Sequence, residues 1–420
     1  MMHESTSTRP GNAQAMPEQI LSVTVCMHVL RAARYDVRAM RAASALIGAG
    51  ASVSIIDIES QQGLSAEEII DGIPVRHLLM PTLFGSVRFE RHTLMNAILL
   101  FLRSILLLLH TPADIYHACE VTALPACYIA ARLRRKPLIF EAYELPLGDR
   151  PIATMGRSRR ILHQLLKVLL AHMVPRCAGV ISVSPPIVEQ IKRRYAVTNV
   201  ALVRNILPYR QVAKSDRLRQ QLDLDQDVRI ALYQGYLQPD RSLDILVRAG
   251  AFLAPRIVVV LMGKGVGTTQ AALQALIADE GIADRVKILP PVPYEQLLEW
   301  TSSADVGLII NAPDYAPNIQ MLLPNKLFEY LMAGVPVLTS QLEAIVEIVT
   351  THRVGQVVPS LEPADVAAAI NALLAHTDEL ERMRQNALQA AREEFYWEKE
   401  SAELISFYCK ILNTNDRKRD

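Results

Sequence analysis

Short apolar segments that favour β-strands alternate with helical patterns along most of the sequence. Residues 20–28 and 51–58 predict two buried strands, and residues 38–49 between them predict an amphipathic helix. Further strands are expected at 114–116, 137–140 and 179–183. Helical patterns between these strands have the length that right-handed crossovers of a parallel sheet require. The alternation therefore predicts a doubly wound α/β domain.

The alternation is interrupted near residue 206 and then begins again. Residues 201–227 leave a strand through Asn205 and Pro208 and become polar and charged, as a connection between domains does. Strands are predicted beyond them at 228–233, 257–262, 286–289, 306–310, 335–338 and 356–358. A chain of 420 residues is long enough for two such domains to bury separate cores.

We therefore expect two Rossmann-like domains, at 18–205 and 206–395. A helix from about 397 to 412, within a C-terminal segment at 396–420, is expected to pack back on the first domain. Residues 1–17 are polar and are expected to form a disordered leader. The five cysteines are scattered and form no CxxC pair, which argues against disulfides or a zinc site and favours the cytoplasm.

Charge is unevenly distributed along the chain. Residues 1–205 hold 23 Lys and Arg against 15 Asp and Glu, a net charge of +8, whereas the remainder holds 21 against 28, a net charge of −7. A basic first half suits an anionic membrane surface or a phosphate-bearing acceptor. Nucleic acid would require the same sign, but no nucleic-acid motif accompanies the charge.

Two predicted helices in the first half are unusually apolar. Residues 93–110 are too few for a clean membrane span, so this helix is either buried in the core or presents a membrane-docking face. Residues 157–173 begin with three arginines and resemble an interfacial helix, with an ordinary surface helix as the alternative. Both helices favour a location at the inner face of the cytoplasmic membrane.

Residues 323–339 carry the strongest functional signal. Their sequence, LPNKLFEYLMAGVPVLT, predicts a turn at Pro324, a short helix, a glycine stop at Gly334 and a buried strand. The start of that helix offers backbone N–H groups around Leu323 and Asn325, together with the positive end of the helix dipole, to a diphosphate.

Two charged side chains follow in the same helix. Lys326 adds positive charge near the diphosphate, and Glu329, one turn further on, can accept two hydrogen bonds from a ribose diol. The alternative is an ordinary surface ion pair between Lys326 and Glu329 at i,i+3. Their position at the start of a helix that leads into a buried strand favours the ligand role.

The segment PNKLFEYLMAGVPVL closely resembles the donor-binding segment of family 4 glycosyltransferases, in which the glutamate of FEY holds the nucleotide ribose. The chain is also similar to that family at 235–249, where Gly235 is the glycine of the turn and Arg241 takes the role of a basic residue that reaches the diphosphate. A third similar segment is VVVLMGKG at 258–265, with Gly263 and Gly265.

Three segments of the first half, at 113–120, 137–146 and 177–191, follow the order of the family, so the resemblance covers about residues 20–412. It implies a GT-B fold, in which two Rossmann-like domains face each other across a cleft. It also implies a nucleotide-sugar donor, retention of anomeric configuration and no metal or other cofactor. The basic first half and the two apolar helices motivate the hypothesis of a glycan or lipid-linked acceptor.

The chain departs from the family pattern at several positions. Members commonly have a glutamate eight residues before the ribose-binding one, where this chain has Met321, and an arginine where it has Tyr236. The resemblance then implies that Lys326 supplies a missing diphosphate charge. Tyr143 precedes Glu144 where relatives often carry a histidine before the glutamate.

Two further sets of residues are candidates near the acceptor. The family's glycine pair after the first strand is replaced by RAARYDVRAMR at 31–41, which offers Asp36 and Arg38 for acceptor or phosphate contacts. His117, at the end of a short strand, is placed where ligands gather in parallel sheets, and a satisfied core histidine is the alternative.

The proposed chemistry is electrostatic. Arg241, Lys326 and the helix start would stabilise the leaving nucleoside diphosphate, while His117, Tyr143 and Glu144 are candidates on the acceptor side. A nucleotide-sugar epimerase of the same fold and a catalytically silent sugar-nucleotide binder are the two alternatives.

Overall fold

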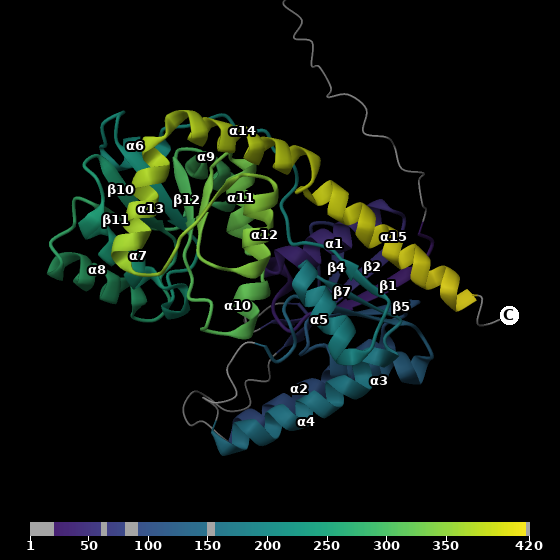
Figure 1. The fold of residues 1–420 in the computed structure, drawn as a ribbon. Helices are drawn as coiled ribbons and strands as arrows, with labels where there is room; N and C mark the ends of the chain where they lie inside the picture. Colours follow the sequence, from purple (N-terminus) through teal and green to yellow (C-terminus); the bar gives the residue numbers. More distant parts are fainter. Residues whose placement is uncertain (1–20, 60–64, 80–90, 149–155, 417–420) are drawn as a thin grey trace, which may run out of the picture. The chain divides into compact units, whose positions relative to one another are not determined.

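A computed structural model describes residues 21–59, 65–79, 91–148 and 156–416 (Figure 1). Within them lie two Rossmann-like domains, each built around its own sheet. The predicted leader at 1–17 lies outside the described residues. The predicted fold class is confirmed.

The first sheet has eight strands in the order β3-β4-β2-β1-β5-β6-β7-β8. Their bounds are β1 Thr24–His28, β2 Ser52–Glu59, β3 Glu67–Ile70, β4 Ile73–Leu79, β5 Ile115–Cys119, β6 Leu138–Ala142, β7 Gly179–Ser182 and β8 Val200–Leu202. The helices of this part of the chain are α1 Val37–Gly48, α2 Arg91–His110, α3 Leu124–Arg134, α4 Arg157–Met173 and α5 Pro185–Tyr195. β1 pairs with β2 in parallel, as the βαβ pattern predicts.

The hairpin of β3 and β4 was not predicted from the sequence. β3 pairs with β4 in the antiparallel sense, so this edge of the sheet is not parallel. Asp71 and Gly72 form the turn and both have positive φ, 49° and 80°. An Asp-Gly pair between apolar residues is a recognised hairpin signal, because both central positions of such a turn need positive φ.

The second sheet has the order β11-β10-β9-β12-β13-β14, and its neighbouring strands pair in parallel. Its strands are β9 Arg229–Gln234, β10 Ile257–Met262, β11 Val286–Leu289, β12 Val306–Ile309, β13 Val337–Thr339 and β14 Gly355–Val357. The helices are α6 Arg217–Leu222, α7 Leu243–Ala249, α8 Thr269–Asp279, α9 Leu297–Thr301, α10 Pro317–Met321, α11 Asn325–Met332, α12 Glu343–Thr351, α13 Pro363–Ala375 and α14 Thr377–Glu393. Two apolar clusters pack with this sheet, and successive β10 residues belong to different clusters.

The described chain forms two compact units. One comprises the described parts of Met1–His117, Ile129–Pro137 and Ile405–Asp420, and the other comprises Ala118–Tyr128 and Leu138–Leu404. The first sheet ends with β8 and the second begins with β9, so the sheets change between Leu202 and Arg229. The domain boundary at residue 206 stays a prediction.

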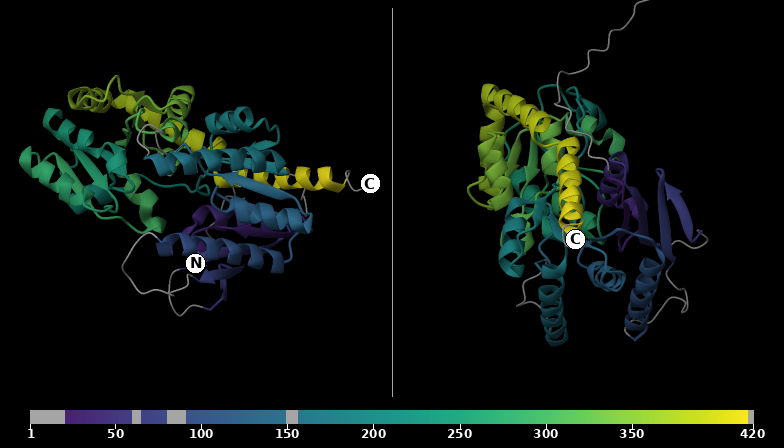
Figure 2. Two further views of the ribbon diagram at one scale, coloured as in Figure 1. Left: turned by 90° about the horizontal axis from the view of Figure 1, so that it is seen from below. Right: turned by 90° about the vertical axis from the view of Figure 1, so that its right-hand side faces the viewer.

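The last helix, α15 Trp397–Asp416, returns to the first sheet, as expected. Its Tyr408 hydroxyl lies 2.6 Å from Nδ1 of His117 in β5. The yellow C-terminal helix runs beside the purple strands in both figures that show the ribbon (Figures 1 and 2). Tyr408 is fully buried there, so the helix completes the core of that unit.

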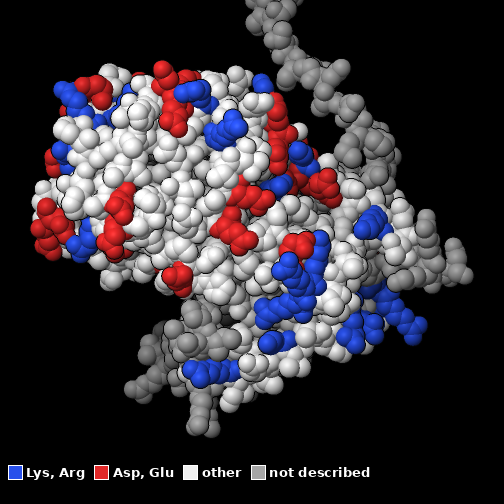
Figure 3. Space-filling view, in the orientation of Figure 1, with Lys and Arg blue, Asp and Glu red and all other residues white. Residues whose placement is uncertain are grey.

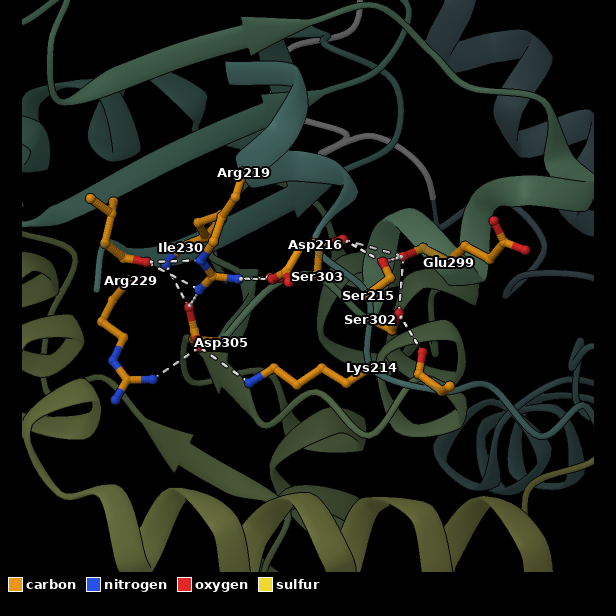
Figure 4. A network of polar contacts seen from close by, with 12 residues as sticks. Lys214, Ser215, Asp216, Arg219, Arg229, Ile230, Glu299, Ser302, Ser303 and Asp305 are labelled. Atoms are coloured by element: carbon orange, nitrogen blue, oxygen red, sulfur yellow. Dashed lines mark hydrogen bonds and ion pairs between the residues drawn. The ribbon is translucent and has the colours of Figure 1, made fainter. Parts of the chain in front are cut away.

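A buried carboxylate anchors the connection between the two sheets. Asp305, just before β12, accepts hydrogen bonds from the backbone N–H of Ile230 at 2.8 Å, from Arg219 of α6 at 2.7 Å and from Arg229 at 3.2 Å (Figure 4). Lys214 lies 3.8 Å away. The polar connection predicted at 201–227 is therefore tied to the amino-terminal ends of β9 and β12.

Candidate functional site

A cavity of about 510 Å³ opens at the carboxyl ends of β9 and β10. Ligands gather at this edge in parallel sheets. Three segments supply most of its polar lining, namely the residues after β9, the residues after β10 and the start of α11. The lining residues from these segments are Gln234, Gly235, Tyr236, Arg241, Gly263, Lys264, Pro324, Asn325, Lys326 and Glu329.

Close backbone packing holds two of these segments together. A Cβ atom on Gly263 would lie 1.7 Å from the carbonyl oxygen of Gly235, so only glycine fits at position 263. Gly235 itself has a φ of 129°, which favours glycine. Leu237 pairs with Gly265 in a short parallel bridge, and Gly265 itself is not among the residues that line the cavity. The glycine-rich turns singled out in the sequence therefore shape the cavity wall.

Arg241 reaches the cavity from a 3₁₀ turn, Pro239–Arg241. The next residue, Ser242, has a left-handed φ of 51°, a conformation that favours glycine. In this chain the Ser242 hydroxyl accepts a hydrogen bond from the backbone N–H of Ala312 at 3.1 Å, which helps to hold the strained residue.

Lys326 occupies the cavity wall at the start of α11. Its Nζ atom lies 3.6 Å from the centre of the Tyr233 ring. Burial, followed by repulsion from Arg241, lowers the pKa of Lys326 to about 7. A diphosphate placed here would compensate both effects, because it replaces lost hydration with opposite charge.

Glu329 lies one helical turn further along α11. Its side chain is buried, and its Oε2 atom accepts a hydrogen bond from Nε2 of Gln234 at 2.5 Å. Gln234 is the last residue of β9 and was not singled out from the sequence. A glutamine at the carboxyl end of a predicted strand, beside a glycine turn, is the only sequence signal that marks it.

Other candidate residues do not line this cavity. Leu323 is buried and directly precedes Pro324, which lines the cavity. His117 is fully buried in β5 and contacts Tyr408, which favours the core-histidine alternative. Tyr143 and Glu144 follow the carboxyl end of β6, and their roles stay predictions.

The segment that carries Tyr143 and Glu144 is held by α10. Asn318 accepts a hydrogen bond from the backbone N–H of Leu145 at 3.0 Å and donates one to the carbonyl of Leu145 at 3.3 Å. The backbone N–H of Asn318 also donates to Gly148 at 3.1 Å. A side-chain amide thus pairs with both backbone groups of one residue, as a neighbouring strand would.

Met321, at the position of the family's additional glutamate, is the last residue of α10. Its carbonyl oxygen accepts a hydrogen bond from the hydroxyl of Ser184 at 2.6 Å. Met321 also lines a second cavity of about 460 Å³, together with Asp314, Gln320 and Glu343. Two carboxylates, those of Asp314 and Glu343, therefore share this cavity with Met321.

In the segment after β1, residues 31–41, the candidate residues Asp36 and Arg38 have structural roles or are buried. Asp36 is the N-cap of α1 and accepts a hydrogen bond from the backbone N–H of Ala39 at 3.0 Å. Arg31 lies 3.5 Å from Asp36, and its side chain is half exposed. Arg38 is buried. Arg31 is thus open to solvent, whereas Arg38 is not.

Surface charge follows the pattern of the sequence. Basic side chains gather over α5, whose last turn carries Lys192, Arg193 and Arg194, whereas acidic side chains gather over α12 (Figure 3). No disulfide joins any of the five cysteines, all of which lie in the described part of the chain.

Two Rossmann-like domains, each built around its own sheet, define the GT-B class. Residues 36–207 match the model of Glycosyltransferase Family 4, and residues 214–390 match that of Glycosyl transferases group 1. The chain belongs to this family of GT-B proteins.

Individual relatives are similar to this chain over only part of its length. The chain is 32% identical over 211 residues to a D-inositol 3-phosphate glycosyltransferase of Streptomyces scabiei, covering 48% of this chain and 46% of the relative. A second protein of that name, from Thermobispora bispora, is 27% identical over 280 residues, which is 63% of this chain and 61% of the relative. The chain spans about half the length of the curated relatives it matches.

Solved structures share the fold. Sucrose-phosphate synthase from Thermosynechococcus elongatus has a TM-score of 0.74 at 17% identity, covering 93% of this chain and 99% of that one. HepE from Anabaena, solved in complex with UDP-glucose, has a TM-score of 0.67 at 16% identity, covering 94% and 100%. At these identities the likeness concerns the fold alone.

Proposed function

We propose that the protein is a glycosyltransferase that moves a sugar from a nucleotide-sugar donor to an acceptor. The observation that carries this proposal is the convergence of Arg241, Lys326 and Glu329 on one cavity at the start of α11. Two cations beside a helix start suit a diphosphate, and a buried carboxylate one turn away suits a ribose diol. HepE, a structural neighbour, was solved with UDP and glucose, which supports a donor of this chemical class.

Each residue has a defined task in this proposal. Arg241 and Lys326 neutralise the charge that grows on the leaving diphosphate as the glycosidic bond breaks, and the first N–H groups of α11 add to that field. Glu329 fixes the ribose and so orients the donor. Tyr143 and Glu144 act on the acceptor side, and transfer retains the anomeric configuration without a metal.

The proposed acceptor is a lipid-linked glycan at the cytoplasmic face of a membrane. One face of α4 exposes Ile161, Leu162, Leu165, Val168 and Leu169, with Val168 70% exposed. Exposed Arg160 and Lys167 lie on the same helix. An apolar face with basic neighbours matches the interface of an anionic bilayer, in which the helix would lie flat.

Helix α2 has a similar outward row, formed by Ile98, Leu102 and Leu106, each about half exposed. The opposite side of α2 buries Ser104 and Leu108. The helix therefore has one side in the core and an apolar row facing outward. Among the described residues, no helix is long and apolar enough to cross a membrane.

A phosphorylated small acceptor is the competing candidate. Two of the matched relatives carry the name D-inositol 3-phosphate glycosyltransferase, and a small anionic acceptor would suit exposed Arg31 beside β1. Inositol 3-phosphate and a membrane lipid extract, offered separately with the same donor, distinguish the two acceptors.

The donor proposal is tested by a thermal-shift and calorimetric screen of nucleoside diphosphates and their sugars. One nucleotide sugar should stabilise the wild type, because a ligand that binds only the folded state raises the unfolding temperature. Glu329→Ala should lose that response. A screen in which no nucleotide stabilises the wild type would contradict the proposal.

A further inference from the structure

Behind the Glu329 carboxylate lies a short chain of buried polar groups. Nε2 of Gln234 lies 2.5 Å from Oε2 of Glu329, and Oε1 of Gln234 lies 2.7 Å from the hydroxyl of Thr301. That hydroxyl is also 2.7 Å from the carbonyl of Leu297. The side chains of Gln234 and Thr301 are almost completely buried. The Thr301 hydroxyl has one hydrogen, which it can donate either to Gln234 or to Leu297. The carboxylate is thus linked through Gln234 to Thr301 of α9.

Chemistry fixes the orientation of the Gln234 amide. An ionised carboxylate only accepts hydrogen bonds, so the NH₂ group of Gln234 must face Glu329. The opposite rotamer would place two acceptor oxygens 2.5 Å apart. The amide oxygen then faces Thr301, whose hydroxyl can donate to it.

Both ends of this chain are attached to rigid structure. Gln234 ends β9, and its backbone N–H donates to the Tyr330 hydroxyl at 3.2 Å. Tyr330 lies next to Glu329 in α11 and donates to the carbonyl of Leu232 at 2.9 Å. The strand end and the start of α11 are therefore joined on both sides of the carboxylate, which restricts its rotamers.

We infer that Gln234, supported by Thr301, is the positioning residue that holds the Glu329 carboxylate in the orientation that recognises the ribose diol of the donor. The inference rests on the proposed function, because it assumes that Glu329 meets ribose. Gln234 acts through Glu329, while Arg241 and Lys326 act on the diphosphate. The role therefore predicts a change in discrimination between ribose and deoxyribose, rather than a general loss of affinity.

The test measures dissociation constants of UDP and 2′-deoxy-UDP by calorimetry, or of the GDP or ADP pair if that base binds more tightly. A hydrogen bond to a charged group gives the wild type about tenfold or greater preference for the ribonucleotide. Gln234→Met keeps the volume but removes the amide, and should reduce the preference to about threefold or less. Thr301→Val, of equal shape, should reduce it to a smaller extent.

Matched variants separate this role from a loss of structure. Arg241→Ala should weaken both nucleotides equally and leave the preference unchanged. Gln234→Met should have no further effect on the preference in the Glu329→Ala background, because both changes remove the same contact. If Gln234→Met does not fold, the inference is tested with Thr301→Val alone. An unchanged preference for the ribonucleotide in Thr301→Val then overturns the inference.

The outcomes also separate the inference from the proposed function. An unchanged preference in Gln234→Met, together with a lost preference in Glu329→Ala, overturns the role of Gln234 and leaves the donor site intact. An unchanged preference in Glu329→Ala contradicts the donor site itself. Equal weakening of both nucleotides by Gln234→Met would show a merely structural role.

Discussion

The ammonium nitrogen of Lys326 lies 3.6 Å from the centre of the Tyr233 ring, inside a wall that also holds Arg241. Burial and the charge of Arg241 lower the pKa of Lys326 to about 7, so the free protein carries this charge only part of the time at neutral pH. A bound diphosphate stabilises the charged form. Donor binding is thereby linked to proton uptake.

This linkage gives a signed pH dependence. Affinity for a nucleoside diphosphate should be constant between about pH 6 and the free-state pKa of Lys326, about 7, and should fall by up to about tenfold per pH unit above that pKa. The phosphate itself is already ionised there, since its second pKa is about 6. Calorimetry in buffers of different ionisation enthalpy measures the uptake. Lys326→Arg, whose side chain stays charged, should bind the nucleoside diphosphate without proton uptake. Proton uptake by this variant equal to that of the wild type would contradict the assignment of the uptake to Lys326.

Gly263→Ala should abolish nucleotide binding while the protein stays folded. The added Cβ would lie 1.7 Å from the carbonyl of Gly235, so the turn after β9 must move away from the cavity. Gly48→Ala is the matched control, because a Cβ there meets nothing within 4 Å and alanine favours the helix. Thermal-shift responses to the best nucleotide compare the two variants, and an unchanged response in Gly263→Ala would show that the turn adapts.

Asp305→Ala should lower the free energy of unfolding by about 3–5 kcal/mol, because it leaves the buried Arg219 guanidinium without its carboxylate. Arg229→Ala should cost about 1 kcal/mol or less, since Arg229 is partly exposed. Urea unfolding followed by tryptophan fluorescence measures both. The preference for ribonucleotides should stay unchanged in each variant that folds, because the network lies at the opposite ends of the strands from the cavity.

Replacing Leu165 and Val168 of α4 together by glutamate should remove binding to vesicles of phosphatidylglycerol and phosphatidylcholine. Both side chains are more than 60% exposed, so the protein should still fold. Co-sedimentation at low salt measures binding, and added salt should weaken binding of the wild type. Phe252→Glu, an exposed apolar position of the second domain, is the control. Wild-type protein that stays in the supernatant would contradict the membrane proposal.

Sequence patterns predicted the regular parts of the fold well. β10 and β11 have the bounds expected from the sequence, 257–262 and 286–289. β10 is buried along its whole length and therefore leaves a continuous apolar signal, whereas β11 is fully buried only at its two ends. The β3–β4 hairpin was missed, although Asp71 and Gly72 mark its turn. Its strands carry charged residues and therefore give no continuous apolar signal.

The candidate site could be predicted only in part. Lys326 and Glu329 were found because they are close in sequence and follow a recognisable helix start. Gln234 contacts Glu329 across 95 residues, and Thr301 contacts Gln234 across 67, so only the tertiary fold reveals them. For α4 the sequence left two interpretations open, an interfacial helix and an ordinary surface helix, and only the structure shows that its apolar side chains point outward.

The central claim is tested most directly by identifying what the protein makes from a nucleotide sugar. The donor that stabilises the protein is incubated with it, inositol 3-phosphate and a membrane lipid extract, and the products are followed by ¹H and ³¹P NMR. We predict release of the nucleoside diphosphate with the sugar transferred to an acceptor, and loss of this reaction in Glu329→Ala. Recovery of the donor as its epimer would show an epimerase, and recovery of the donor unchanged would show a silent binder; either result would contradict the account.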